Sequence, residues 1–428
     1  MKPSKLRIIL FVIIAGIVGY LFGVYKVTLD WQNYRPQLLI INQEPPPSIQ
    51  TMDMTPFWTV AQAIETSFYD RKAINPQNMV NGAISGMIST LNDPFTMYLP
   101  PTNNTAFKQQ ISGQFQGIGA ELTTNNKQVL IMASLDGSPA QKVGLKSGDV
   151  IEKVNGEDIT GMDLNTVVNM IKGPKGTRVT LTILPKGSQT TKNIVITRDT
   201  INVKTVTSWI KPIKDIPSIN AKASGLANNQ NKEIAYIRLS EFGEQTDQEW
   251  SPIVNNLALE LKKNPNIKGV ILDLRENPGG LLSDALYIAS EFLPQGATVV
   301  KQQDAYGNIK ALTVTRTGVL QNVPLVVLID GGSASASEIV SGALRDNNRA
   351  KLVGEKSFGK GTVQDAEDLP NGAGLHVTVA KWLTPNGTWV GNGKNGTGLK
   401  PDVTVSLNPK DPTHDTQLEA GIQTLLSE

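Results

Sequence analysis

The sequence predicts an α/β core with a partly parallel sheet, an inserted β-rich module, a helical N-terminal region and one N-terminal transmembrane helix. Three observations support this fold class. Strand-like and helix-like segments alternate from about residue 230 onward, which favours parallel strands joined by helices. Short strand-like runs separated by Gly, Asp, Asn and Pro fill residues 104–200. An uncharged apolar run covers Ile8–Tyr25.

This apolar run has the length of a membrane span. Its 18 residues extend about 27 Å as a helix, close to the ~30 Å hydrocarbon core of a bilayer. Basic residues gather before it, which predicts that residues 1–25 form a short cytoplasmic stub and the transmembrane anchor, and that the remainder is extracytoplasmic. A cleaved signal peptide is the alternative, but no small-x-small site follows Tyr25, so an uncleaved single-pass anchor is favoured.

The next two segments connect this anchor to the main body. Residues 26–56, which include Pro45-Pro46-Pro47, are interpreted as a linker. Residues 57–103 show helical periodicity, and Asn75-Pro76 fits an N-cap followed by proline at the first helical position. The region is too small for a core of its own, so we expect it to pack on the main body or on a second copy of the chain.

The remaining elements follow from periodicity and turn signals. In the β-rich module (104–200), strands are expected at 129–132, 150–151, 178–183 and 192–196, with a helix over Leu164–Ile171. In the core (201–411), strands are expected at 234–237, 269–274 and 323–329, and helices at 246–262, 281–292 and 336–345. Thr246-x-x-Glu249 resembles a capping box at the start of the first of these helices. Residues 412–428 are expected to end in a helix.

Composition limits the chemistry. The 428 residues contain no Cys and two His, His376 and His414, which excludes thiol nucleophiles and clustered-histidine zinc sites. A net charge of +2 is too balanced for an electrostatic nucleic-acid binder. No cofactor or metal is expected. A catalyst must use Ser, Thr, Lys, Asp, Glu, Tyr, backbone groups or one isolated histidine; His376 is interpreted as a sheet residue and His414 as part of a polar tail.

One segment places serines beside a helix start. A buried strand ends at Gly331-Gly332, and Ser333, Ser335 and Ser337 alternate into a helix. Free N–H groups at a helix start can bind a developing oxyanion. The alternative is that these are N-cap serines, with Glu338 satisfying the helix dipole. The local pattern does not separate the three serines.

A second segment supplies a possible base. Lys360 lies between Gly359 and Gly361, where glycines allow another element to approach the backbone closely. Burial of a lysine lowers its pKa, and a neutral lysine can take a proton from a serine hydroxyl. A Ser–Lys pair is therefore an economical nucleophile in a chain with so little histidine.

Two other motifs compete for this segment. Gly354-x-x-x-x-Gly359-Lys360 approaches a phosphate-binding loop, but Gly361 stands where Ser or Thr should hold magnesium. Ser357-x-x-Lys360 and Ser208-x-x-Lys211 match the Ser-x-x-Lys of penicillin-interacting enzymes, a pattern that arises by chance in a chain of this length. The motifs Ser-Asp-Asn and Lys-Thr-Gly, which accompany Ser-x-x-Lys in those enzymes, are both absent from the sequence.

The chain resembles the C-terminal processing peptidases of family S41, serine proteases with a Ser/Lys dyad that act on protein tails. The motifs that carry the resemblance lie at 93–99, 273–280 (Asp-Leu-Arg-Glu-Asn-Pro-Gly-Gly), 332–338 (Gly-Ser-Ala-Ser-Ala-Ser-Glu), 357–364 and 399–403, and the likeness covers roughly residues 57–428. The resemblance implies that Ser335 is the nucleophile, Lys360 the base and Gln364 the residue that orients the lysine. It implies an oxyanion hole from the Ala336 N–H and an N–H of either Gly279 or Gly280.

The β-rich module is similar to a PDZ domain. Gly117-Ile118-Gly119-Ala120 resembles the carboxylate-binding loop, and 138–140 and 148–151 match later turns. The resemblance implies that successive N–H groups hold a peptide's terminal carboxylate while the peptide adds to a sheet edge. The expected partners are C-terminal tails of envelope or secreted proteins.

The function implied is a membrane-anchored extracytoplasmic serine endopeptidase. It would recognise tails through the PDZ domain and hydrolyse peptide bonds with the Ser/Lys dyad. A non-catalytic PDZ scaffold that binds C-terminal peptides is the alternative, and the intact Ser335, Lys360 and Gln364 argue against it.

Overall fold

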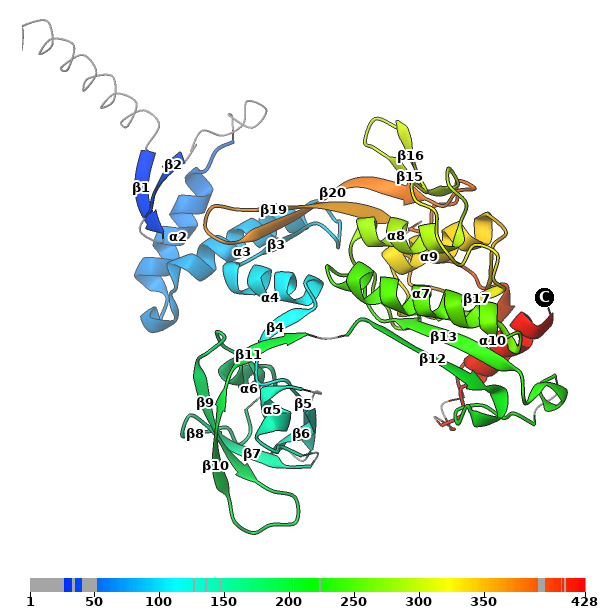
Figure 1. Ribbon diagram of the computed structural model, residues 1–428. Coiled ribbons are helices and arrows are strands. Elements are labelled where there is room, and N and C mark those ends of the chain that lie inside the picture. Colours follow the sequence, from blue (N-terminus) through cyan, green and yellow to red (C-terminus); the bar gives the residue numbers. More distant parts are fainter. Residues whose placement is uncertain are drawn as a thin grey trace, which may run out of the picture. The chain divides into compact units, whose positions relative to one another are not determined.

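The computed structural model describes residues 27–32, 35–40, 52–125, 128–134, 137–146, 148–162, 164–202, 204–222, 225–391, 397–408, 410–411 and 413–427 (Figure 1). The predicted anchor Ile8–Tyr25 lies outside these residues. Within them, no helix combines the length and apolarity that a membrane crossing requires. The chain forms two compact units that divide after Pro101, with Glu367–Leu375 belonging to the first.

The first unit begins with a strand pair and continues with helices. Strands β1 (Val27–Gln32) and β2 (Arg35–Ile40) pair antiparallel, followed by α2 (Thr55–Ser67), the 3-10 turn η2 (Arg71–Ala73), α3 (Pro76–Ser89) and β3 (Met97–Leu99). The interpretation of 26–56 as a linker is therefore wrong for the paired residues. β-Branched and aromatic residues over 27–32 favour a strand, and a two-stranded ribbon tolerates Pro36 because both of its strands are edges.

Helices α2 and α3 expose apolar side chains. The predicted cap is confirmed, since Asn75 Oδ1 accepts the Asn78 N–H at 3.0 Å. Neither helix buries a residue. The exposed apolar residues include Trp58, Val60, Ile64, Val80 and Met87. Short helices gain most of their stability from packing an apolar face, so these two present surface suited to a partner.

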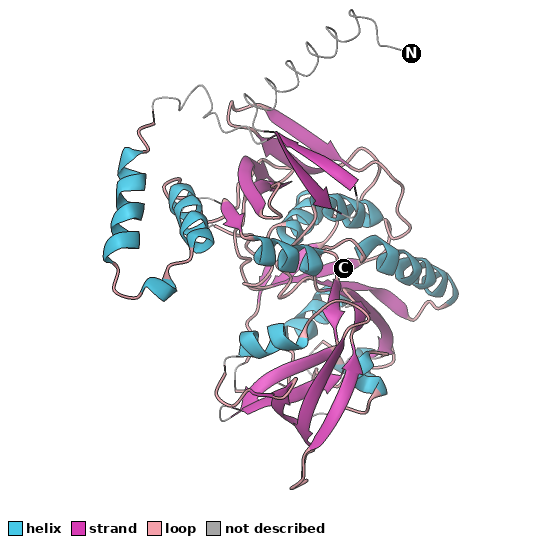
Figure 2. Ribbon diagram, turned by 90° about the vertical axis from the view of Figure 1, so that its left-hand side faces the viewer, coloured by secondary structure: helices cyan, strands magenta, loops and turns pink. Residues whose placement is uncertain are grey.

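The second unit starts with α4 (Pro101–Ile111) and the β-rich module (Figure 2, lower part). The module contains β4 (Gln114–Gly117), β5 (Ala120–Asn125), β6 (Gln128–Ser134), α5 (Pro139–Lys142), β7 (Val150–Val154), β8 (Glu157–Asp158), α6 (Leu164–Ile171), β9 (Arg178–Leu184), β10 (Lys192–Thr197) and β11 (Asp199–Asn202). The main sheet runs β10-β9-β7-β6-β5, and β11 pairs with β4. The predicted strands and helix are confirmed, and β5 lies at the end of its sheet.

The core sheet is mostly parallel, as predicted. Its order is β12 (Val206–Pro212), β13 (Glu233–Leu239), β14 (Ile267–Asp273), β17 (Leu325–Ile329), β18 (Lys351–Gly354) and β21 (Val403–Thr404), and only β12 pairs antiparallel. Helices α7 (Thr246–Lys263), α8 (Leu282–Phe292) and α9 (Ala336–Asp346) cover one face, and α10 (Thr416–Ser427) covers the other (Figure 1).

The connections of this sheet differ at its two ends. The short 3-10 turns η3 (Ile213–Asp215) and η4 (Ala227–Asn229) join β12 to β13. Because the carboxyl ends of parallel strands meet at one edge, the turns after β14, β17 and β18 come together there.

A second sheet runs β16 (Ile309–Thr313), β15 (Thr298–Gln303), β20 (Gly374–Leu383) and β19 (Thr362–Asp368), and most of its residues belong to the second unit. Strand β19 directly follows Lys360 and Gly361. A phosphate-binding loop leads into a helix, so this strand argues against the nucleotide-binding interpretation.

The predicted capping box at α7 is wrong. The N-cap residue is Gln245, and Thr246 Oγ1 accepts the Gly243 N–H at 2.8 Å. Glu249 instead accepts the N–H groups of Thr205 (2.7 Å) and Val206 (3.0 Å), which holds the start of β12. These partners are more than 40 residues away in the sequence, so a local motif could not reveal them.

Asp284 lies in the first turn of α8, and its Oδ2 atom is buried with no hydrogen-bond partner among the described residues. Burial raises the pKa of this carboxyl to about 6, and the nearby Asp247 carboxylate adds to the effect. The folded protein then holds the proton more tightly than the unfolded chain. The free energy of unfolding therefore falls as the pH rises from about 4 through about 6.

We expect Asp284→Asn to raise the free energy of unfolding by about 1 kcal/mol at pH 8 and to change it little at pH 4.5, after allowance for the partial exposure of this site. Urea unfolding at the two pH values measures the difference. Asp304→Asn is a control, for which the change in the free energy of unfolding at high pH should have the opposite sign. A hydrogen bond from Asn308 lowers the pKa of Asp304 instead of raising it. An equal effect of Asp284→Asn at both pH values would contradict the assignment.

Candidate active site

Ser335 occupies the sharp turn between β17 and α9. It is the N-cap residue of α9, with φ 53° and ψ −113°, in a region that non-glycine residues rarely adopt. Its side chain is half-buried. Strained backbone of this kind persists only where the surroundings hold it, and it concentrates at functional sites.

The structure distinguishes the three alternating serines. The Ser333 hydroxyl donates to the Leu274 carbonyl (2.8 Å), and the Ser337 hydroxyl donates to the Asn277 carbonyl (2.8 Å); both side chains are fully buried. The Ser335 hydroxyl donates to none of the described residues. Two serines therefore fasten the turn to the segment after β14, and the third remains available for chemistry.

The turn after β14 packs directly against Ser335. A Cβ placed on Gly279 would lie 2.7 Å from Ser335 Cβ and 2.9 Å from the Ala336 nitrogen, so only glycine allows this approach. The two segments predicted to form an oxyanion hole are therefore adjacent. The Gly279 N–H already donates to Asn277 Oδ1 at 2.9 Å. The N–H groups of Gly280 and Ala336 form no hydrogen bond with a described residue.

Phe242 fixes this glycine turn from the other side. Its N–H donates to the Gly279 carbonyl, and its carbonyl accepts the Leu281 N–H, both at 2.9 Å. Gly280 has φ 137°, and a Cβ there would collide with the Phe242 carbonyl oxygen. The turn is thus held in one arrangement by backbone hydrogen bonds.

Glu338 links the serine turn to the lysine loop. This fully buried carboxylate accepts the N–H groups of Ser335 (2.9 Å), Gly359 (2.7 Å) and Lys360 (2.9 Å) and the Ser357 hydroxyl (2.6 Å). Burial raises the pKa of Glu338, while the hydrogen bonds from Ser357 and the backbone oppose that shift. Sequence analysis assigned Glu338 only a role at the helix dipole, and it missed the hydrogen bonds that Glu338 accepts from the lysine loop.

The backbone of Lys360 is held by tryptophans. The Lys360 carbonyl accepts Trp382 Nε1, and the Gly361 carbonyl accepts Trp389 Nε1, each at 2.9 Å. A Cβ on Gly361 would meet the backbone nitrogen of Gly391, which explains why glycine follows the lysine. The Lys360 side chain is half-buried.

The other candidates near Lys360 have structural partners. Ser357 donates to Glu338 and accepts the Leu399 N–H at 2.6 Å, which argues against a Ser357-x-x-Lys360 nucleophile. Gln364 Nε2 donates to the hydroxyls of Thr362 (2.8 Å) and Thr378 (3.1 Å). Both threonines flank Gln364 on β19 and β20, so they fix the orientation of its amide.

The two histidines lie where the sequence placed them. His376 is a residue of β20, and its ring packs edge-on against Phe107 with centroids 4.5 Å apart. Burial, and then the nearby charge of Lys360, lower the pKa of His376. His414 lies in the segment before α10, 2.8 Å from the Glu419 carboxylate.

A buried ionic network holds the segment that follows β14. Arg275 donates to Asp273 (2.6 Å) and to Asp415 (2.8 Å), and the Tyr236 hydroxyl donates to Asp273 at 2.6 Å. Burial and the Asp273 carboxylate raise the pKa of Tyr236. The network ties the segment before Gly279 to the start of α10.

The predicted carboxylate loop precedes the edge strand β5. Ile118 is buried, and its carbonyl accepts the Ala140 N–H at 2.8 Å. Gly119 has φ 71°, and a Cβ there would lie 2.4 Å from Ser138 Cβ. The N–H groups of Ile118 and Gly119 donate to no described residue. Adjacent free N–H groups in such a turn form an anion-binding concavity.

The sequence matches three known families. Residues 233–405 match peptidase family S41, residues 130–185 match a PDZ domain, and residues 19–102 match the N-terminal domain of the activating protease CtpB. The chain is 34% identical over 346 residues to the carboxy-terminal processing protease CtpA of Bacillus subtilis, covering 81% of this chain and 67% of that protein. It is 35% identical over 348 residues to a probable CtpA-like serine protease of Staphylococcus aureus, covering 81% and 63%. The chain thus spans about two thirds of the length of these relatives.

Among solved structures, the photosystem II D1 C-terminal processing protease is 30% identical to this chain. The match covers 87% of this chain and 91% of that protein, with a TM-score of 0.48. The family matches and the curated relatives define a serine-type peptidase with a PDZ domain. The chain belongs to the C-terminal processing peptidases of family S41.

Proposed function

We propose that Ser335 and Lys360 form the catalytic dyad. Neutral Lys360 takes the hydroxyl proton of Ser335 as the serine oxygen attacks the peptide carbonyl carbon. The same lysine then gives the proton to the leaving amine, and water hydrolyses the acyl-enzyme. The observation that carries the proposal is the buried Glu338 carboxylate, which binds the backbone of both residues.

Three further groups assist this step. The Ala336 N–H and the Gly280 N–H stabilise the oxyanion, since the Gly279 N–H is already bound by Asn277. Gln364 accepts a hydrogen bond from Lys360 through Oε1, because its amide nitrogen is held by two threonine hydroxyls. Donors fixed before reaction cost no reorganisation during it.

The PDZ domain selects the substrate. A peptide adds to the open edge of β5, and its terminal carboxylate binds the N–H groups of the Gly117–Ala120 loop. Cleavage then occurs upstream of the captured C-terminus. The substrates are C-terminal tails of envelope or secreted proteins, because residues 8–25 anchor the chain with its peptidase part outside the cytoplasm. The exposed apolar faces of α2 and α3 suit a second copy of the chain.

Cleavage of tailed reporters tests this function. The full chain, purified in detergent, is incubated with a folded reporter that ends in an unstructured apolar tail and with the same reporter lacking the tail, and mass spectrometry maps the cuts. We expect only the tailed reporter to be cut, and we expect removal of residues 104–200 to abolish this preference.

Two outcomes would contradict these proposals. Binding of the tailed reporter without any cleavage would favour the non-catalytic scaffold. Unchanged tail preference after removal of residues 104–200 would remove the PDZ domain from substrate selection.

A further inference from the structure

Asp330 joins the two turns that meet at the candidate site. It directly follows β17, and its side chain is buried. Its Oδ1 atom accepts the Glu276 N–H at 2.8 Å, just before the glycine turn, and the Gly332 N–H at 2.9 Å, in the serine turn. The Ser333 hydroxyl accepts the Asp330 N–H at 2.9 Å, which fixes the backbone of Asp330 as well. One carboxylate oxygen therefore holds the backbone of both turns.

Glu276 lies in a strained conformation beside this carboxylate. Its φ of 53° falls in the left-handed region, which a residue other than glycine rarely adopts. A Cβ built on Gly332 would lie 2.9 Å from both Cδ and Oε2 of Glu276, so only glycine at that position leaves room for the carboxyl. The Glu276 side chain thus lies over the serine turn, within hydrogen-bond reach of Asp330.

Glu276 and Asp330 form a carboxyl pair. The charge of Asp330, and then a hydrogen bond between the two side chains, raise the pKa of Glu276, and burial contributes less. The folded protein therefore holds the Glu276 proton more tightly than the unfolded chain does. The stabilisation that this proton provides is present at acid pH and is lost as the pH rises through the folded pKa of Glu276.

Cations near the pair are shared with other carboxylates. Arg238 on β13 attracts the Glu276 carboxylate and opposes the rise of its pKa, but its Nη1 atom also lies 3.6 Å from Asp273 Oδ1. Arg275, the residue before Glu276, donates to Asp273 and to Asp415. Both arginines are divided among several anions, and the largest influence on Glu276 remains a like charge.

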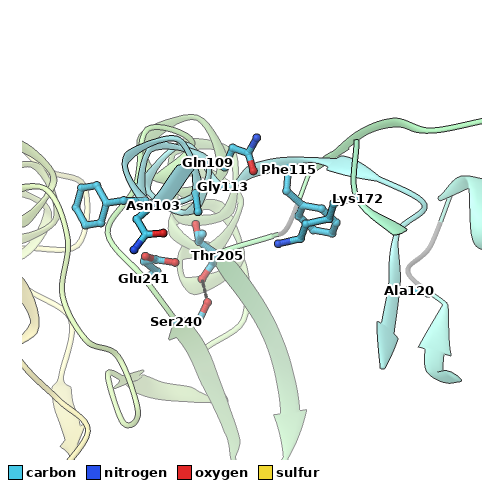
Figure 3. A pocket seen from close by; sticks show the side chains of 11 residues that line it. Asn103, Gln109, Gly113, Phe115, Ala120, Lys172, Thr205, Ser240 and Glu241 are labelled. Carbon is cyan, nitrogen blue, oxygen red and sulfur yellow. Dashed lines mark hydrogen bonds between the residues drawn. The ribbon is translucent and has the colours of Figure 1, made fainter. Parts of the chain in front are cut away.

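Other carboxylates come from the elements around the two turns. Glu338, at the start of α9, is bound by the lysine loop and the serine turn. Glu241, after β13, lines a cavity of about 630 Å³ to which neither member of the pair contributes (Figure 3). Glu355, after β18, is partly exposed, and its N–H donates to the carbonyl of the last residue of β17 at 2.9 Å. These groups add negative charge, so they do not relieve repulsion within the pair.

We propose that Asp330 is a positioning residue that fixes the glycine turn against the serine turn, and that Glu276 makes this connection depend on pH. The inference rests on the dyad and the oxyanion hole proposed above. When Glu276 is protonated, its carboxyl O–H donates to the Asp330 carboxylate, and a side-chain bond adds to the backbone bonds between the turns. When Glu276 is ionised, the two carboxylates repel each other and the connection loosens. Turnover then falls, because the oxyanion donor and the nucleophile are held less closely in register.

Turnover at two pH values tests the role of Glu276. Glu276→Gln keeps the volume and donates an amide N–H to Asp330 at every pH. Glu355→Gln removes one negative charge from the same edge of the sheet and leaves the pair intact, so it accounts for the effect of lost charge on Lys360. We expect the kcat of Glu276→Gln divided by that of Glu355→Gln to be about 1 at pH 5 and roughly threefold or more at pH 8. A ratio that does not change with pH overturns the role of Glu276.

Two variants test the positioning role of Asp330. Asp330→Ala removes the shared acceptor, so it should lower kcat by about tenfold or more and change KM for the tailed reporter little. Asp330→Asn keeps one acceptor oxygen and removes the repulsion, so it should restore kcat and show the same gain at pH 8 as Glu276→Gln. Parental kcat in Asp330→Ala, or an Asp330→Asn enzyme without the gain at pH 8, overturns the role of Asp330. The second variant decides the matter if the alanine variant does not fold.

Ser335→Ala in the same assay separates this inference from the proposed function. If that variant is inactive and the ratio for Glu276→Gln is flat, only the pH-dependent connection is wrong. If Ser335→Ala cleaves the tailed reporter at the parental rate, the dyad is wrong and this inference fails with it.

Discussion

Ser335→Ala should lower kcat/KM for a tailed substrate by at least about 10³-fold while the protein remains folded. The alanine keeps the backbone of the N-cap position and removes the hydroxyl that we propose as the nucleophile. Lys360→Arg should cause a loss of similar size, because an arginine stays protonated at any working pH and cannot accept the serine proton. Initial rates of reporter cleavage measure both effects, and thermal unfolding confirms that the fold is retained.

The double variant provides a sharper test of the dyad. If Ser335 and Lys360 act in one proton transfer, the double variant should be no slower than the worse single variant. Ser341→Ala is the matched control on the same helix, because the Ser341 hydroxyl is buried without a hydrogen-bond partner among the described residues. Its kcat/KM should match that of the parent. An active Lys360→Arg enzyme would falsify the assignment of the base.

Glu338→Ala should destabilise the protein by about 3–5 kcal/mol, because it leaves four donors without their acceptor inside the protein. Glu338→Gln keeps one acceptor oxygen and nearly the same volume, so it should fold. Its turnover should still fall by about tenfold or more, because the serine turn and the lysine loop are no longer held by one anion. Guanidinium unfolding gives the stability, and kcat is measured on the folded protein.

A second buried glutamate separates these two effects. Glu291 is equally buried, accepts bonds from Arg316 and from the Val319 N–H, and lies outside the proposed active site. Glu291→Gln should lower the free energy of unfolding and leave kcat of the folded protein unchanged. If Glu338→Gln behaves in the same way, with wild-type kcat, Glu338 has no positioning role.

The core sheet could be predicted because its strands are buried on both faces. Continuous apolar runs such as Leu325–Ile329, separated by helix-period segments, specify parallel strands without knowledge of any particular contact. Asn75-Pro76 predicted the start of α3 equally well, because an N-cap side chain bonds to a backbone N–H only three residues away. In both cases the physical cause lies within a few residues of the signal.

The interactions that build the candidate site lie beyond that range. Glu338 bonds to Ser357 across 19 residues and to Lys360 across 22. Ser333 and Ser337 find their acceptors 59 and 60 residues away. Periodicity tells which side chains are buried, but it does not tell which loop supplies their hydrogen-bond partners. The same limit produced the error at Glu249, whose pattern fits a cap and whose partners, Thr205 and Val206, lie at the start of β12.

The left-handed backbone at Ser335 implies that stability and activity oppose each other at this position. Glycine adopts φ near 53° without the steric cost that a side chain pays there, so the fold alone would favour glycine at 335 by about 1 kcal/mol. A screen for thermostability would thus reward loss of the proposed nucleophile. If Ser335 acts as proposed, an engineered, more stable form of this peptidase should be sought at other positions.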